Sequence, residues 1–211
     1  PPRSTLFPYT TLFRSVLNVD SEGKFEFGPR FYMLGQAAKK RSKLIHVVHP
    51  YLERINRETK LSAFLGIRSH LRTVLIDKVD SAYGVKVSSE IGMQMPALAG
   101  AAIKAMISLL DKPQADELID HAQMTRYTPR TIVDKAAYKA EIDKVRREGF
   151  AFDEEEYIEG LVAVAAPIHV KVDHMQAAIW AVGLAQQVPP ETLHGLGILL
   201  KEIAEEIDRQ M

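Results

Sequence analysis

The chain has 211 residues, of which 46% are hydrophobic and 26% charged; it has no cysteine, and 27 basic residues balance 27 acidic ones. This is the composition of an ordinary folded protein, and the length suits one domain of moderate size with an appendage. The zero net charge argues against nucleic-acid binding by these residues alone, because phosphate binding needs a local excess of lysine and arginine, and the lack of cysteine excludes disulfides and thiol chemistry.

The first fifteen residues are expected not to belong to the natural protein. Residues 5–15 read TLFPYTTLFRS, and reading them back into codons gives the common adapter sequence of short-read DNA sequencing. The alternative is a genuine β-rich arm, since threonine, phenylalanine and tyrosine favour strands. We expect residues 1–15 to be adapter-derived, with the natural sequence beginning near Val16 and its own N-terminus missing.

The next segment predicts a small hairpin and two helices. Short strands are expected over 16–20 and 24–27, on either side of the turn residues 21–23. Pro29 suits the first turn of a helix that runs toward Lys43. A second helix follows, and its apolar residues recur at helical spacing on one face: Leu44, Val48, Leu52 and Ile55.

The middle of the chain predicts strands followed by helices. Residues 62–68, 73–79 and 85–89 are typical of strands, residues 92–96 of a loop, and residues 97–110 and 113–124 of helices.

The C-terminal part predicts a helix, three strands and a last helix. Asp134 is a candidate N-cap, and Gly149 is suited to the left-handed residue that ends the helix. A short strand over 150–152 leads into four consecutive carboxylates, which cannot be buried without partners and so should lie at a surface or a pocket mouth. Two apolar strands over 161–168 and 175–182 are joined by a polar tip, and a helix opening at Pro189 should dock on the sheet through Leu193, Leu196, Leu200, Ile203 and Ile207. The order of elements predicts an α+β fold, an antiparallel sheet with flanking helices.

The sequence contains no catalytic, metal-binding or phosphate-binding motif that we can identify, so we expect neither an enzyme nor a cofactor. His46, His49 and Glu53 are metal-ligand types that can share a helix face, but a satisfied or exposed histidine pair is the favoured interpretation. His169, Asp173 and His174 are interpreted as a solvated turn. The pair Gly195 and Gly197 falls within a helical pattern, and no strand precedes it as a nucleotide-binding motif requires.

Several blocks of the sequence, in order, resemble the C-terminal effector-binding half of IclR-type transcriptional regulators, the isocitrate lyase regulator family. No single block is specific, but the ordered set covers about Val16 to Met211. The blocks are Phe25–Arg30, His49–Glu53, Pro96–Ala105, Thr131–Ile132, Val145–Arg146, Gly149–Ala151, Asp153–Glu155, Gly160–Leu161 and Val164–Ile168.

The resemblance implies how the chain is organised and what it does. Residues 16–28 would be the last hairpin of a largely missing winged-helix domain, residues 29–43 a linker helix, and residues 44–211 a GAF-like effector-binding domain. Operator DNA would be bound only through the missing domain, because no recognition helix is present. The resemblance further implies a homodimer or homotetramer in the cytoplasm, with no membrane association.

The resemblance also implies an effector pocket between a helix start and the C-terminal sheet. Gly100, Ala101 and Ala102 match the helix start, whose backbone N–H groups can hold a carboxylate, although tight packing would equally explain small residues there. Asp153 matches a polar pocket residue, whereas Glu154–Glu156 are expected to face solvent.

Three further pocket positions match Ala163, Trp180 and Val182. Where sensors of small acids tend to carry cysteine and serine, these side chains offer no hydroxyl, so we expect an aromatic or bulkier carboxylate in place of a glyoxylate- or pyruvate-like ligand. The alternative for Trp180 is a simple core residue. Two other functions stay open: a sensory module with a non-DNA output, and an enzyme that acts on a small acid, for which Asp153 with a nearby histidine would be the only acid–base candidate.

Overall fold

The computed structural model describes residues 17–19, 24–170 and 175–211, and the chain divides into two compact units, Pro1–Lys43 and Leu44–Met211. The adapter-like residues 1–15 lie outside the described residues, as do Asp173 and His174. Among the described residues, no helix is long and apolar enough to cross a membrane.

The first unit contains the predicted hairpin and helix. Strand β1 (Leu17–Val19) pairs antiparallel with β2 (Phe25–Phe27), and helix α2 spans Pro29–Arg41. Four large apolar side chains of α2 are exposed by 49–71%: Phe31, Tyr32, Met33 and Leu34.

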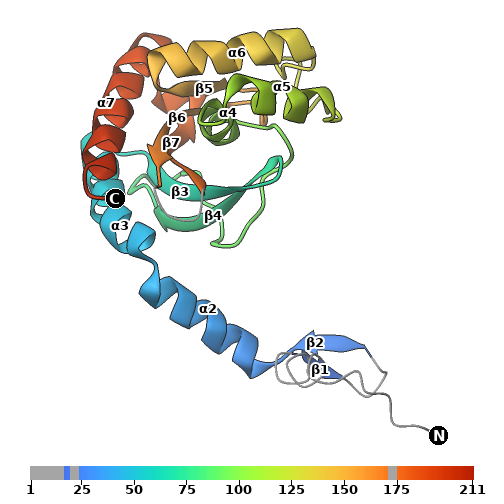
Figure 1. Cartoon of the computed structure of the whole chain (residues 1–211). Coiled ribbons are helices and arrows are strands. Elements are labelled where there is room, and N and C mark those ends of the chain that lie inside the picture. The colour runs from blue at the N-terminus through green and yellow to red at the C-terminus, as the bar shows by residue number, and fades with distance from the viewer. Residues whose placement is uncertain (1–16, 20–23, 171–174) are drawn as a thin grey trace, which may run out of the picture. The chain divides into compact units, whose positions relative to one another are not determined.

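The second unit is built on a five-stranded antiparallel sheet with the strand order β4-β3-β7-β6-β5 (Figure 1). The strands are β3 (Ser62–Ser69), β4 (Arg72–Val79), β5 (Ala151–Glu154), β6 (Leu161–His169) and β7 (Gln176–Leu184). The helices are α3 (Lys43–Thr59), α4 (Ala101–Ser108), α5 (Lys112–Asp120), α6 (Lys135–Glu148) and α7 (Pro190–Asp208), with the short 3-10 helix η1 (Ala185–Gln187) before α7. The α+β prediction with an antiparallel sheet is confirmed.

Helices cover both faces of this sheet, and the alternation of side chains along the strands decides which residues each face receives. Helices α3 and α7 pack on one face against Ala63, Leu65, Val162, Val164, Ala166, Ile179 and Ala181. Helix α4, with α5 and α6 behind it, packs on the other face against Phe64, Ala163, Ala165, Ala178, Trp180 and Val182. The strands β6 and β7 are apolar on both sides because both of their faces are buried.

Local signals account for the ends of the helices. The Asp134 carboxylate accepts a 2.7 Å hydrogen bond from the N–H of Ala137, and Gly149 ends α6 in the left-handed conformation with φ of 86°, both as predicted. Helix α7 begins at Pro190, with the predicted first residue Pro189 as its N-cap. Gly197 lies on the buried face of α7, where an added Cβ would lie 2.5 Å from ring carbons of Phe150.

Two predicted elements differ from the structure. Residues 85–89 form no strand; the carbonyl of Val85 accepts a hydrogen bond from the Gln187 side chain and that of Val87 from the Ser62 hydroxyl, so side chains take the place of a neighbouring strand. The helix predicted from residue 97 begins only at Ala101. Leu98 and Gly100 have positive φ of 56° and 85°, which the α-helix excludes.

Candidate functional site

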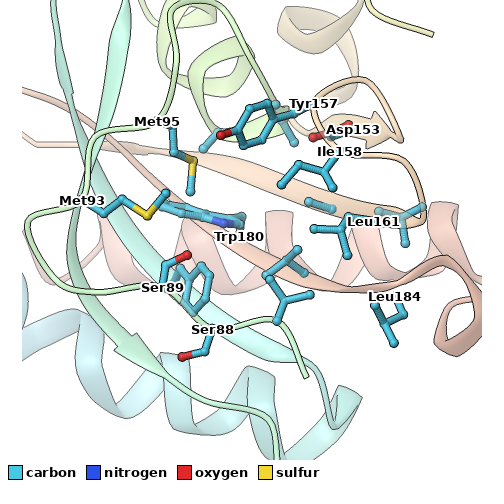
Figure 2. A pocket seen from close by; sticks show the side chains of 18 of the residues that line it. Ser88, Ser89, Met93, Met95, Asp153, Tyr157, Ile158, Leu161, Trp180 and Leu184 are labelled. Atoms are coloured by element: carbon cyan, nitrogen blue, oxygen red, sulfur yellow. The ribbon is translucent and has the colours of Figure 1, made fainter. Parts of the chain in front are cut away.

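A cavity of about 400 Å³ opens on the α4 face of the sheet, and all seven residues proposed for the site line it (Figure 2). They come from three places in the sequence: Gly100, Ala101 and Ala102 at the start of α4; Asp153 on β5; and Ala163, Trp180 and Val182 on β6 and β7. The structure therefore brings the predicted residues together. Their role in binding stays a prediction.

The start of α4 presents backbone N–H groups to this cavity. Gly100 is the N-cap, and no side chain caps the helix. No hydrogen bond from the N–H groups of Gly100, Ala101 or Ala102 occurs among the described residues. All three residues are buried and line the cavity. Buried N–H groups at a helix start are suited to an anion.

Asp153 lies beside this helix start. Asp153 is only 8% exposed, and its Oδ1 accepts a 2.7 Å hydrogen bond from the N–H of Glu156. Oδ2 lies 3.3 Å from the point where a Cβ on Gly100 would be, so it is directed at the helix N-terminus. Burial raises the pKa of the Asp153 carboxyl, while its backbone hydrogen bond with Glu156 and the charge of Lys104 oppose the rise.

The expectation that Glu154–Glu156 all face solvent is wrong for Glu156. Its carboxylate accepts a 2.6 Å hydrogen bond from Lys104, whose side chain is 0% exposed, and the Glu156 side chain is only 14% exposed. Burial raises the pKa of Glu156, and Lys104 opposes the rise. Sequence reasoning missed Lys104, although a lone lysine in the otherwise apolar and small-residue stretch 97–107 was the available signal.

The ion pair fastens the loop 155–160, two of whose residues, Tyr157 and Ile158, line the cavity. Two hydroxyls hold the same loop from the other side. Thr128 donates to the carbonyl of Glu155 at 2.7 Å, and Thr131 donates to that of Glu156 at 2.6 Å. This wall of the cavity is therefore anchored both to α4 and to the segment that precedes α6.

The floor of the cavity is the sheet itself, with Trp180 at its centre. Trp180 faces Phe64 on β3 and Ala165 on β6 in register, and the rings of Phe64 and Trp180 meet edge to face with centroids 5.5 Å apart. Gly66 makes room for the indole, because a Cβ there would lie 2.9 Å from two of its ring carbons. Trp180 is 3% exposed and lines the cavity, so it belongs to both core and wall.

The segment between β4 and α4 forms a further wall of the cavity. The sequence alone did not place this segment in the site. The contributing residues are Lys86, Val87, Ser88, Ser89, Met93 and Met95. In Figure 2, Met95 lies above one end of Trp180 and Met93 beside that end, Ser88 and Ser89 lie below it, and Asp153 and Tyr157 lie toward the opposite end. Ser88 is fixed by hydrogen bonds with Asp80 and Lys78. The cavity is thus largely apolar, with polar groups gathered at its ends.

The histidines considered as metal ligands have other partners. His49 Nδ1 lies 2.7 Å from Asp77 Oδ2, and His49 Nε2 lies 3.8 Å from Glu53. His169 Nδ1 lies 2.6 Å from Asp208, at the end of α7. Among the described residues, no group of three or more histidine, aspartate or glutamate side chains is arranged to hold a metal ion.

Comparison with known proteins gives matches along almost the whole chain. The family model described as bacterial transcriptional regulator IclR C-terminal matches residues 36–209. The transcriptional repressor IclR of Escherichia coli strain K12 is 26% identical over 211 residues, covering 98% of this chain and 77% of the relative.

Two solved structures are similar in fold. The C-terminal domain of E. coli KdgR superposes with a TM-score of 0.70 and 26% identity, covering 81% of this chain and 99% of that one. A double mutant of the PobR inducer-binding domain from Acinetobacter, in complex with 3-hydroxybenzoic acid, superposes with a TM-score of 0.70 and 24% identity, covering 81% of this chain and 100% of that one.

Proposed function

The chain belongs to the IclR family of bacterial transcriptional regulators and carries its C-terminal effector-binding domain, and on this premise we propose that the cavity binds a small organic carboxylate, preferably an aromatic one. One observation carries the proposal: buried backbone donors at the start of α4, which have no hydrogen-bond partner among the described residues, lie at the same apolar cavity as Trp180. The donors suit the carboxylate, and the indole with its apolar surroundings suits a ring.

The absence of hydroxyls at three wall positions supports the preference for a bulkier acid. Ala163, Trp180 and Val182 offer no side-chain oxygen, so a small hydrophilic acid would find no hydroxyl partner at these three positions. A volume of about 400 Å³ is of the size expected for a site that takes a ring-sized ligand. The ligand of the solved PobR complex, 3-hydroxybenzoic acid, belongs to this class.

The same proposal covers regulation and assembly. Residues 44–211 act as the effector domain and residues 29–43 as the linker helix. Operator DNA is bound through a winged-helix domain to which residues 16–28 belong. The regulator acts in the cytoplasm. The effector changes DNA binding only through its differential affinity for two arrangements of the paired chains. The exposed apolar side chains of α2 support a homodimer or homotetramer in which that helix is covered by a second copy.

The test is a thermal-shift screen followed by Trp180 fluorescence, because a ligand that binds the folded state stabilises it by mass action. The panel contains benzoate, 3-hydroxybenzoate, phenylacetate, glyoxylate and pyruvate. We expect the aromatic acids to raise the melting temperature more than the small acids and to change the tryptophan emission. Equal shifts of the melting temperature with all five acids would contradict the proposed preference. A shift of the melting temperature and a change of tryptophan emission with glyoxylate alone would also contradict it.

A matched pair of glycine variants tests the location of the site. Gly100→Ala adds a methyl 3.3 Å from Asp153 Oδ2 at a residue with φ of 85°, whereas Gly92→Ala adds one at φ of 92° with nothing within 4 Å. Both positions have positive φ, so both variants carry a backbone penalty. Only Gly100→Ala should abolish the ligand-induced shift, and an unchanged shift in that variant would place the ligand elsewhere.

A further inference from the structure

Two polar features lie next to each other at one end of the cavity: the carboxyl of Asp153 and the backbone N–H groups at the start of α4. Asp153 Oδ2 lies 3.3 Å from the Cβ position of Gly100, and the Asp153 carboxyl interacts with the backbone N–H groups of Glu156 and Tyr157. The unpaired N–H groups of the α4 start lie at that same residue and the two that follow. A carboxylate bound to these N–H groups would therefore lie in contact with the buried carboxyl of Asp153.

The surrounding charges cannot compensate two carboxylates there. Lys104 approaches from α4, but its ammonium is hydrogen-bonded to Glu156 at 2.6 Å. Glu154 adds negative charge from the Asp153 strand itself, and Tyr138 on α6 offers only a phenol, which donates to the carbonyl of Leu98.

Two more charged groups lie farther out. Glu141 on α6 raises the pKa of Glu156 and so adds negative charge to the cluster. Lys86, which lines the cavity, is exposed to solvent, and its charge lowers the pKa of Asp80. With Asp153 ionised, the buried cluster already holds two carboxylates for one ammonium, so a third anion needs a compensating positive charge.

We infer that the cavity takes up the carboxylate of its effector together with one proton from solvent, which is then shared between that carboxylate and Asp153. This inference rests on the proposed function. The proton joins Asp153 Oδ2, the neutral carboxyl donates a hydrogen bond to the ligand, and the ligand keeps its single negative charge on the α4 N–H groups. One O–H bond forms at Asp153 Oδ2 as the proton leaves its donor in the solvent or buffer, and every other change is a hydrogen bond. Burial already raises the pKa of Asp153 before the ligand arrives, which makes the protonation easier.

The inference has a consequence for specificity. A singly charged acid leaves the closed cluster with the same charge as before, since the proton offsets the incoming anion. A dianion of similar size, such as phthalate, brings one more charge that no described group at this end of the cavity can neutralise. The cavity should therefore select monocarboxylates over dicarboxylates.

The first test measures proton uptake on the whole 211-residue chain. Benzoate, 3-hydroxybenzoate and phenylacetate are titrated calorimetrically in two buffers that differ in ionisation enthalpy, between about pH 6 and pH 8. We expect uptake of close to one proton and a Kd that weakens by up to about tenfold per pH unit. Binding with no proton uptake and no pH dependence overturns the inference and leaves the proposed function standing. Absence of binding by every acid at every pH overturns both.

The second test replaces the ionisable group. In Asp153→Asn the amide oxygen can still accept from the N–H of Glu156, and the amide nitrogen takes the place of the protonated oxygen. The variant should bind the same acids without proton uptake, with a Kd independent of pH, and at the upper end of the pH range more tightly than the unmodified chain. Weaker binding at every pH by a folded variant overturns the inference. If the variant does not fold, the two-buffer result on the unmodified chain decides.

Discussion

Replacing Lys104 with methionine should destabilise the second unit more than any exposed charge replacement. Methionine keeps the length of the apolar stem, so the change removes the ammonium with little change in packing. The Lys104 side chain is 0% exposed, and its partner Glu156, 2.6 Å away, is 14% exposed. Breaking such a pair leaves a nearly buried carboxylate without its counter-ion, which costs about 3 kcal/mol of the free energy of unfolding.

The assay is equilibrium unfolding in urea, followed by the fluorescence of Trp180, the one tryptophan in the chain. With a denaturant slope of about 2 kcal/mol per molar, the midpoint should fall by about 1.5 M. The double variant Lys104→Met/Glu156→Gln leaves no charge behind and should recover about 1–2 kcal/mol of that loss. Lys112→Met, which removes a lysine that is 57% exposed, should leave the midpoint unchanged.

Two outcomes would refute this reasoning. A midpoint for Lys104→Met equal to that of the unmodified chain would mean that Glu156 turns to solvent at little cost. Additive losses in the double variant would mean that the two side chains stabilise the protein independently, although they lie in hydrogen-bond contact.

Two further predictions use the same assay. Burial raises the folded-state pKa values of Asp153 and Glu156 above those of the unfolded chain, so the folded protein holds more protons in the intervening pH window, and the free energy of unfolding falls as pH rises through it. Asp153→Asn should therefore gain stability relative to the unmodified chain as pH rises; a constant difference would contradict the assignment. Gly197→Ala, whose added methyl would lie 2.5 Å from Phe150, should lower the free energy of unfolding by about 1–3 kcal/mol. Gly195→Ala, whose methyl meets nothing within 4 Å, should raise it by about 0.5–1 kcal/mol. Equal effects of the two variants would refute this packing account.

Much of the fold was predictable because its signals are local. The N-cap at Asp134 and the left-handed stop at Gly149 are set by residues within one or two turns of the helix end. The apolar runs of β6 and β7 identify strands buried on both faces. The grouping of seven residues around one cavity followed from the resemblance to the IclR family, since no periodicity relates Gly100 to Trp180.

The parts that sequence reasoning missed depend on contacts between distant residues. Lys104 and Glu156 are 52 positions apart, so the sequence around Glu154–Glu156 predicts three solvent-facing carboxylates and gives no sign of the buried lysine. The segment 85–89 has the composition of a strand, but the side chain that bonds the Val85 carbonyl comes from Gln187, 102 positions away. Such partners appear only when the chain is folded, and strand propensity carries no information about them.

The two-sided burial of the sheet has a consequence for how ligand preference can change. Along β6 and β7, neighbouring positions point to opposite helical layers, so Ala163 and Val182 reach the cavity while Val164 and Ala181 support α3 and α7. Replacements that reshape the recognition surface therefore leave the opposite layer untouched. A lineage, or a protein engineer, can retune such a sensor by editing alternate residues of two strands while the scaffold beneath them stays the same.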